Sequence, residues 1–343
     1  MNRLLDRRSW SFLVVGFLVG VLVTTVGLAF TVRQSSRAGQ GGEQTVLKLA
    51  HSLDTNHPVH DGLVFMADRL AERSSGSVTL QIFPNGQLGS ETECLEQLQR
   101  GALAMTKTST APMESFVSDM AVFSVPYVFR DADHCWRVLE SDIGERLLDA
   151  GAQVGLRGLC YFDAGCRSFY TIEHPVRSPA DLKGLLIRVQ KSKTSMDMVE
   201  ALGGAPTPIP WGELYTALQQ KRIDGAENNL PSFHTNRHFE VCKHLTLDEH
   251  TIVPDLLVVS EPIWSRLPAN VQQWVRESAA EASLHQRALW AKATKEALAA
   301  VQDHGVTIYQ VDKQAFADSV ASMHQTYVGT SVGDLIADIK ATP

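Results

Sequence analysis

Residues 269–304 show an almost uninterrupted helical pattern of about 36 residues without a glycine or a proline. At a rise of about 1.5 Å per residue, such a helix is roughly 54 Å long and exceeds the width of one small domain. A helix of this length usually lies against two bodies. The chain has 343 residues, which is enough for two domains with a core each. The sequence therefore predicts two bodies joined by a long helix near the C-terminus.

Strand and helix patterns alternate along the rest of the chain, which indicates an α/β fold. Apolar alternation predicts strands from Thr45 onward and over residues 78–82, and short apolar runs predict strands over residues 185–190 and 256–260. Apolar spacing of three and four residues predicts helices over residues 59–70, 91–100, 193–202 and 211–221. Ser178 and Pro179 predict a further helix start, since serine caps a helix and proline suits its first turn.

The amino end has the pattern of a segment that directs export. Arg3, Arg7 and Arg8 precede an uncharged apolar run of 23 residues that begins at Trp10 and ends at Val32 (10–32). The core of a cleaved signal peptide usually has about 7–15 residues, and a bilayer span has about 20. A cleaved signal peptide and a retained membrane anchor both stay open for residues 1–41, which end in a Gly/Ser-rich linker. Either one places the folded part outside the cytoplasm.

The remaining composition excludes several classes of function. Beyond residue 41 the chain has 26 Lys and Arg against 37 Asp and Glu, so we expect no nucleic-acid partner. The five cysteines lack metal spacing and are best interpreted as small buried apolar residues, with one disulfide left open. No sequence motif for catalysis or phosphate binding is present, and the histidines are dispersed. We therefore predict no enzyme, no cofactor and no metal site.

Two arginines in the middle of the chain point to an anion site. Arg167 lies in YFDAGCRSFYT (161–171), and Arg188 lies in DLKGLLIRVQ (181–190). A guanidinium presents a planar fork that matches a carboxylate in two parallel hydrogen bonds. For either arginine alone, a structural salt bridge is the simpler interpretation. Together with the amide-rich segment DGAENN (224–229), the pair predicts a site for a small organic acid.

Longer phrases carry a family resemblance. GLLIRVQ, ALGGAPTPIPWGELYTALQQKRIDGAEN and FPNGQLGSETE resemble the substrate-binding proteins of tripartite ATP-independent periplasmic (TRAP) transporters, the DctP-type family. The resemblance extends from about Leu47 to the long helix. It implies a two-lobed periplasmic binding protein fold with hinge strands, and a long C-terminal helix that crosses both lobes. The first lobe would comprise residues 45–164 and 253–293, and the second lobe residues 165–252 and 294–343. Ligand would then bind in the cleft between them.

The resemblance also assigns three ligand contacts. Arg188 matches the arginine that clamps the ligand carboxylate, and Arg167 matches a second arginine of the family site. Asn228 stands where the family places an amide that faces the ligand. A salt bridge from Arg167 to Asp163 or another acid is the structural alternative, and Glu227 is expected to hold its own turn.

Further polar and aromatic residues are candidate contacts, each with a structural alternative. The candidates are Glu91, Glu93, His51, Lys107, Ser109, Trp211 and His250. The two glutamates also suit a helix N-terminus, and Lys107 could point to solvent. Trp211 offers an apolar face to a sugar ring, or packs at the start of its own helix. His57, at the start of a helix, is expected to be solvated.

These features predict a periplasmic solute-binding protein that captures an organic acid and delivers it to the membrane subunits of a TRAP transporter. YFDAGCRSFYT, ENNLPSFHTNRHFE and LDEHTIVPD look like family members that bind hexuronates such as D-glucuronate and D-galacturonate. C4-dicarboxylates, 2-oxo acids and sialic acid are the alternative ligands. A sensor tethered to the membrane through residues 10–32 stays open. A lyase that uses Lys107 or a histidine is disfavoured, because no nucleophile–base pair is visible.

Overall fold

A computed structural model describes residues 44–343 of the chain. The predicted export segment, including residues 10–32, lies outside the described residues. Between residues 44 and 343, none of the helices combines the length and hydropathy that a bilayer span requires.

Five strands form the first sheet, in the order β2-β1-β3-β10-β4. They are β1 (Thr45–Ala50), β2 (Val78–Phe83), β3 (Met105–Ser109), β4 (Leu156–Phe162) and β10 (Asp255–Ser260). β1 and β3 are parallel, whereas β10 runs antiparallel between β3 and β4. Every residue of β3 and β10 is buried, which explains the apolar run of β10. The helices that precede β4 are α2 (Pro58–Arg73), α3 (Glu91–Gln99), α4 (Thr110–Met113), η1 (Ser118–Ser124), α5 (Ala132–Leu139), α6 (Asp142–Asp149) and η2 (Ala152–Val154).

Six strands form the second sheet, in the order β11-β9-β5-β8-β6-β7. They are β5 (Cys166–Thr171), β6 (Leu186–Val189), β7 (Ala205–Pro208), β8 (Gly225–Asn228), β9 (His244–Ile252) and β11 (Thr307–Gln310). The helical elements between β5 and β9 are η3 (Pro179–Leu182), α7 (Lys193–Ala201), α8 (Trp211–Gln219), α9 (Leu230–Thr235) and η4 (His238–Glu240). The helix predicted after Ser178 is wrong in kind, since η3 is a single 3-10 turn followed by Gly184 at a φ of 81°.

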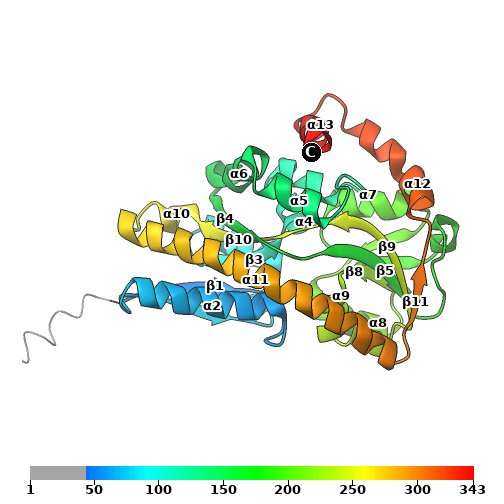
Figure 1. The fold of residues 1–343 in the computed structure, drawn as a ribbon, viewed down its shortest axis with the longest axis horizontal. Coiled ribbons are helices and arrows are strands. Elements are labelled where there is room, and N and C mark those ends of the chain that lie inside the picture. The colour runs from blue at the N-terminus through cyan, green and yellow to red at the C-terminus, as the bar shows by residue number, and fades with distance from the viewer. Residues whose placement is uncertain (1–43) are drawn as a thin grey trace, which may run out of the picture. The chain divides into compact units, whose positions relative to one another are not determined.

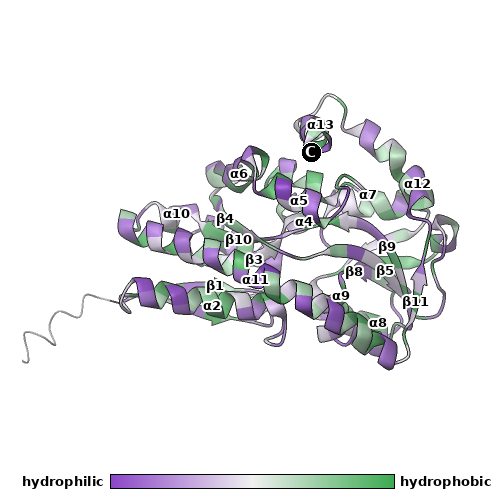
Figure 2. Ribbon diagram, in the orientation of Figure 1, coloured by the Kyte–Doolittle hydropathy of each residue, from purple (hydrophilic) through white to green (hydrophobic). Residues whose placement is uncertain are grey.

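The predicted long helix is confirmed as α11 (Ala269–Asp303), which follows the short α10 (Glu261–Trp264) and has 35 residues. It packs along helix α2 and along β4 of the first sheet. It then packs against α9, a helix beside the second sheet (Figure 1). Val275 and Ala282 belong to a core cluster of the first sheet, while Val301 belongs to a cluster of the second. Hydrophilic and hydrophobic residues alternate along α2 and α11, as expected for helices with one buried face (Figure 2).

Two short crossings connect the sheets, from β4 to β5 and from β9 to β10. Gln286 of α11 fixes the first crossing, because its amide accepts from Asp163 N and donates to Asp163 O, both at 2.8 Å. Gly165 follows at a φ of 56°, where a Cβ would lie 2.9 Å from Nε1 of Trp290. The crossing therefore requires glycine both for its backbone angle and for its approach to α11.

The last two helices pack on different sheets. α12 (Lys313–Thr326) packs against α7 and β9. α13 (Ser331–Ala341) instead packs against η1 and α6, and its apolar residues, including Leu335 and Ile339, join a core cluster of the first sheet. We infer that the lobe boundaries follow the two sheets, with α13 in the first lobe rather than with the rest of residues 294–343.

Candidate functional site

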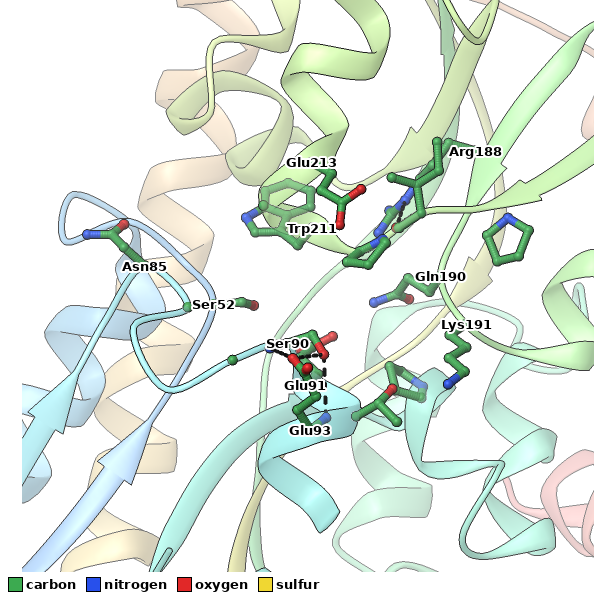
Figure 3. A pocket seen from close by; sticks show the side chains of 18 of the residues that line it. Ser52, Asn85, Ser90, Glu91, Glu93, Arg188, Gln190, Lys191, Trp211 and Glu213 are labelled. Atoms are coloured by element: carbon green, nitrogen blue, oxygen red, sulfur yellow. Dashed lines mark hydrogen bonds between the residues drawn. The ribbon is translucent and has the colours of Figure 1, made fainter. Parts of the chain in front are cut away.

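A cavity of about 610 Å³ is lined by loops and helices beside the first sheet and by strands and adjoining segments of the second sheet. It adjoins an inner cavity of about 30 Å³, and the two share Ser52, Glu91, Arg188, Gln190 and Trp211. Figure 3 shows Arg188 and Trp211 on one side of the larger cavity, with Ser90, Glu91 and Glu93 on the other. The inner cavity is also lined by Lys107 and Asp255 of the first sheet and by Arg167 and Asn228 of the second.

Arg188 is a buried cation with few partners. Its side chain extends from β6, and the residue is 3 % exposed. Nε donates to Ile209 O at 2.8 Å, and the guanidinium carbon lies 5.9 Å from the ring centre of Trp211. Within residues 44–343, Nη1 has no hydrogen-bond partner and no carboxylate forms a salt bridge with Arg188. Burial lowers the pKa of Arg188. The burial of such a charge destabilises the folded protein unless an anion pairs with it.

Arg167, in contrast, has a carboxylate as its partner. Its Nε and Nη2 donate to the two carboxylate oxygens of Glu227, the second at 2.8 Å, and Nη1 donates to Oδ1 of Asn228 at 2.8 Å. The structural alternative predicted for Arg167 therefore exists, with Glu227 as the acid and not Asp163. The prediction that Glu227 holds a turn is wrong, because Gly225–Asn228 is a strand, β8, paired with β5. A ligand contact by Arg167 or Asn228 stays a prediction.

His250 lies behind this ion pair and lines neither cavity. Its Nδ1 is 2.7 Å from Oδ2 of Asp248, and its Nε2 is 3.4 Å from Oε2 of Glu227. Burial alone would lower the pKa of His250, but the two carboxylates outweigh it and raise the pKa to about 9. Burial likewise opposes ionisation of Glu227, yet Arg167 and His250 hold its pKa at about 2. The four side chains form a buried chain of alternating charge.

Lys107, Asp255 and Glu91 form a second charged cluster. Lys107 lies in the middle of β3 and is buried, so the alternative that it points to solvent is wrong. Its Nζ donates to Oδ2 of Asp255 at 2.9 Å and lies 3.5 Å from Oε1 of Glu91, which also accepts from Ser109 N at 3.0 Å. Burial raises the pKa of Asp255 to about 6, although Lys107 opposes this. Asp255 was not predicted; an acid at the first position of the apolar strand β10 was the available signal.

The remaining predicted contacts are divided between the cavities and the surrounding structure. Trp211 lines both cavities, and Ser109 lines the inner one, where its Oγ donates to Oε1 of Gln190 at 3.4 Å. Glu93 lines the outer cavity, but its carboxylate caps α3 through Ser90. Gln190 and Ser52 line both cavities and were not predicted.

His51 is buried but lines neither cavity, and its Nε2 is 3.0 Å from Nδ1 of His60. His57 is also buried, 3.1 Å from Oγ of Ser232, so the expectation that it is solvated is wrong. Its ring therefore joins the start of α2 to α9.

Within residues 44–343, no group of three or more His, Cys, Asp and Glu is placed to hold a metal ion.

A cavity between two α/β lobes, with an unpaired buried arginine on its wall, defines a solute-binding protein for an anion. The chain belongs to the bacterial extracellular solute-binding protein family 7, the DctP family, whose model matches residues 49–330. Its members are periplasmic solute-binding proteins of TRAP transporters, which work with integral membrane subunits. The predicted family and fold class are thereby confirmed.

Similar proteins cover most of the chain. A solute-binding protein from Chromohalobacter salexigens is 35 % identical over 288 residues, which cover 83 % of this chain and 86 % of the relative. A TRAP solute-binding protein from Bradyrhizobium, solved with galacturonate, is 39 % identical with a TM-score of 0.84 and covers 86 % of this chain and 99 % of that one. Another from Pseudomonas putida, solved with D-glucuronate, is 38 % identical with a TM-score of 0.83 and covers 86 % and 97 %.

Proposed function

We propose that this protein captures a hexuronate, such as D-glucuronate or D-galacturonate, in the periplasm and delivers it to the membrane subunits of a TRAP transporter. The unpaired guanidinium of Arg188 on the cavity wall is the observation that carries the proposal. A carboxylate would supply the missing counter-ion and accept from the orphaned Nη1. The similar proteins solved with glucuronate and galacturonate support the choice of acid.

The other cavity groups suit the hydroxyls and ring of a sugar acid. Asn228 offers an amide, Glu91 offers carboxylate oxygens, and Trp211 offers an aromatic face beside Arg188. Arg167 keeps one free Nη1 hydrogen beyond its bond to Asn228. Of the predicted contacts, we assign Arg188, Arg167, Asn228, Glu91, Lys107, Ser109 and Trp211 to the ligand site. We assign Glu93, His51 and His250 to supporting positions.

Function then consists of binding and closure around the ligand, with no bond made or broken. Ligand that bridges the two lobes favours the closed state by its differential affinity for that state. Recovery of unchanged glucuronate from the complex, followed by NMR, tests this directly, since an enzyme would release a product.

Export through the basic start and residues 10–32 fits the periplasmic family. N-terminal sequencing of the mature protein distinguishes a cleaved signal peptide from a retained anchor.

Thermal unfolding of the purified protein with a ligand panel tests the proposed ligand. Ligand at about 100 times Kd adds roughly 2.7 kcal/mol to the free energy of unfolding. We expect that shift with D-glucuronate or D-galacturonate, and its loss in Arg188→Ala. Arg100→Ala, which removes an exposed arginine of the first lobe, is the matched control and should keep the shift. If succinate, pyruvate or sialic acid stabilised the protein and the uronates did not, the proposal of a hexuronate ligand would be contradicted.

A further inference from the structure

We propose that Lys107, Asp255 and Glu91 restrict this site to ligands with a single carboxylate. The inference rests on the proposed function, because it takes Arg188 as the clamp for one carboxylate of a sugar acid. It assigns this cluster, made of Lys107 and Asp255 of the first sheet and Glu91 of α3, to the opposite task, which is to reject a second carboxylate.

The charges around the inner cavity are paired with one exception. The charge of Arg167 is neutralised by Glu227, with which Arg167 makes a bidentate salt bridge. Lys107 is shared between two acids, Asp255 and Glu91. Arg188 has no acidic partner among the described residues of the site. One unpaired buried cation matches one ligand carboxylate.

The cluster lies beside the first sheet and the clamp in the second, but all four residues line the same inner cavity. Arg188 lies on β6, whereas Lys107 lies on β3 and Asp255 on the neighbouring β10. Figure 3 shows Glu91 across the larger cavity from Arg188. A ligand whose carboxylate rests on Arg188 and which bridges the sheets therefore presents its other end to the cluster.

The free oxygens of the cluster are acceptors. Lys107 occupies Oδ2 of Asp255, while Lys107 and Ser109 N occupy Oε1 of Glu91. No described residue donates to Oδ1 of Asp255 or Oε2 of Glu91. Both acids are largely buried, with side chains 8 % and 14 % exposed, respectively. A hydroxyl can donate to these oxygens, whereas a second carboxylate would meet like charge with little water to screen it.

The competing interpretation makes Lys107 a second anion clamp. Its ammonium has three hydrogens, of which Asp255 and Glu91 use two, so a third donor is left. The cluster nevertheless carries two acids for one cation, and a dicarboxylate would raise the number of acids to three. Lys191 also lines the outer cavity, but it is exposed, where water and salt screen its charge.

Isothermal titration with matched ligands separates the two interpretations. D-gluconate and D-glucarate are both open chains and differ in one terminal group, CH₂OH or COO⁻. D-glucuronate is titrated beside them. Gluconate and glucuronate are the two monocarboxylates. We expect the wild type to bind whichever of them has the higher affinity at least tenfold more tightly than it binds glucarate. In Asp255→Asn and in Glu91→Gln, which remove one negative charge each, this preference should fall at least fivefold. Glu200→Gln, an exposed acid on α7, is the control and should leave the preference unchanged.

Each outcome has one meaning. Equal or tighter binding of glucarate by the wild type overturns the inference and supports Lys107 as a second clamp. A wild-type preference that neither variant changes also overturns it, provided that thermal unfolding shows both variants folded. Binding of none of the three ligands, by contrast, contradicts the proposed function itself.

Discussion

Arg167 donates two parallel hydrogen bonds to the carboxylate of Glu227, from Nε to Oε2 and from Nη2 to Oε1. Arg188 is equally buried but has a backbone carbonyl, Ile209 O, as its hydrogen-bond acceptor within the described chain. Two arginines that the sequence presents alike therefore differ in their electrostatic state. Arg167 has an internal counter-ion, whereas Arg188 has none among the described residues, as the proposed carboxylate clamp requires.

Removal of the two arginines should change the stability of the ligand-free protein in opposite directions. Arg167→Met removes the arginine partner of the buried Glu227 carboxylate, which keeps only His250 nearby, and should lower the free energy of unfolding by about 3–5 kcal/mol. Arg188→Met removes an unpaired buried cation and should raise it, by about 1 kcal/mol or more. Urea unfolding without ligand measures both. Similar losses in the two variants would show that Arg188 has an internal counter-ion.

Glu114 should stabilise the arrangement of the two lobes. It follows α4 of the first lobe, and its carboxylate accepts from Thr194 N at 3.2 Å and Thr194 Oγ1 at 3.0 Å, at the start of α7 in the second lobe. Glu114→Ala should lower the free energy of unfolding by about 1–3 kcal/mol and speed ligand release several-fold. Stopped-flow release measures the second effect. Glu145→Ala, an exposed acid on α6, is the control, and equal release rates in the two variants would contradict this role.

Stability should depend on pH through His250. Its pKa is about 9 in the folded protein, where Asp248 and Glu227 outweigh the effect of burial, against 6.5 in the unfolded chain. The folded state therefore holds the proton more tightly, and this contribution is complete below pH 6.5 and is lost as the pH rises towards 9. The loss is on the order of 3 kcal/mol. Urea unfolding at both ends of this range should show the decline in the wild type and a smaller one in His250→Gln; equal declines would contradict the prediction.

The five cysteines should be free thiols of low reactivity. Cys94, Cys135, Cys160 and Cys242 are buried, Cys166 is partly buried, and none forms a disulfide within residues 44–343. Burial raises the pKa of Cys166 to about 12, so little thiolate forms at neutral pH. Ellman's reagent should titrate five thiols in denaturant and react slowly with the native protein. Three thiols in denaturant would reveal a disulfide.

Periodicity predicted the α/β class and α11, because these depend on local patterns of apolar residues. The kind of element at 224–229 was predicted incorrectly, since β8 is a short strand whose burial between β5 and β6 is a tertiary effect.

The pairing within the site could not be predicted from the sequence. Glu227 lies 60 positions from Arg167, and Asp255 lies 148 positions from Lys107. Nothing in the sequence assigns one acid to each cation across such distances. The family resemblance identified the two arginines but not the difference in their partners. That difference depends on which acids the strand register brings alongside each guanidinium.

Arg188 is proposed to clamp the carboxylate of a hexuronate, and removal of each of the two charges in turn tests this ion pair. D-glucuronate and its neutral amide, D-glucuronamide, would be titrated into the wild type and Arg188→Met. We expect the wild type to prefer the acid by roughly 10- to 100-fold, and the variant to show almost no preference. Equal affinity of the wild type for acid and amide, or a preference that survives in Arg188→Met, would contradict a carboxylate clamp at Arg188.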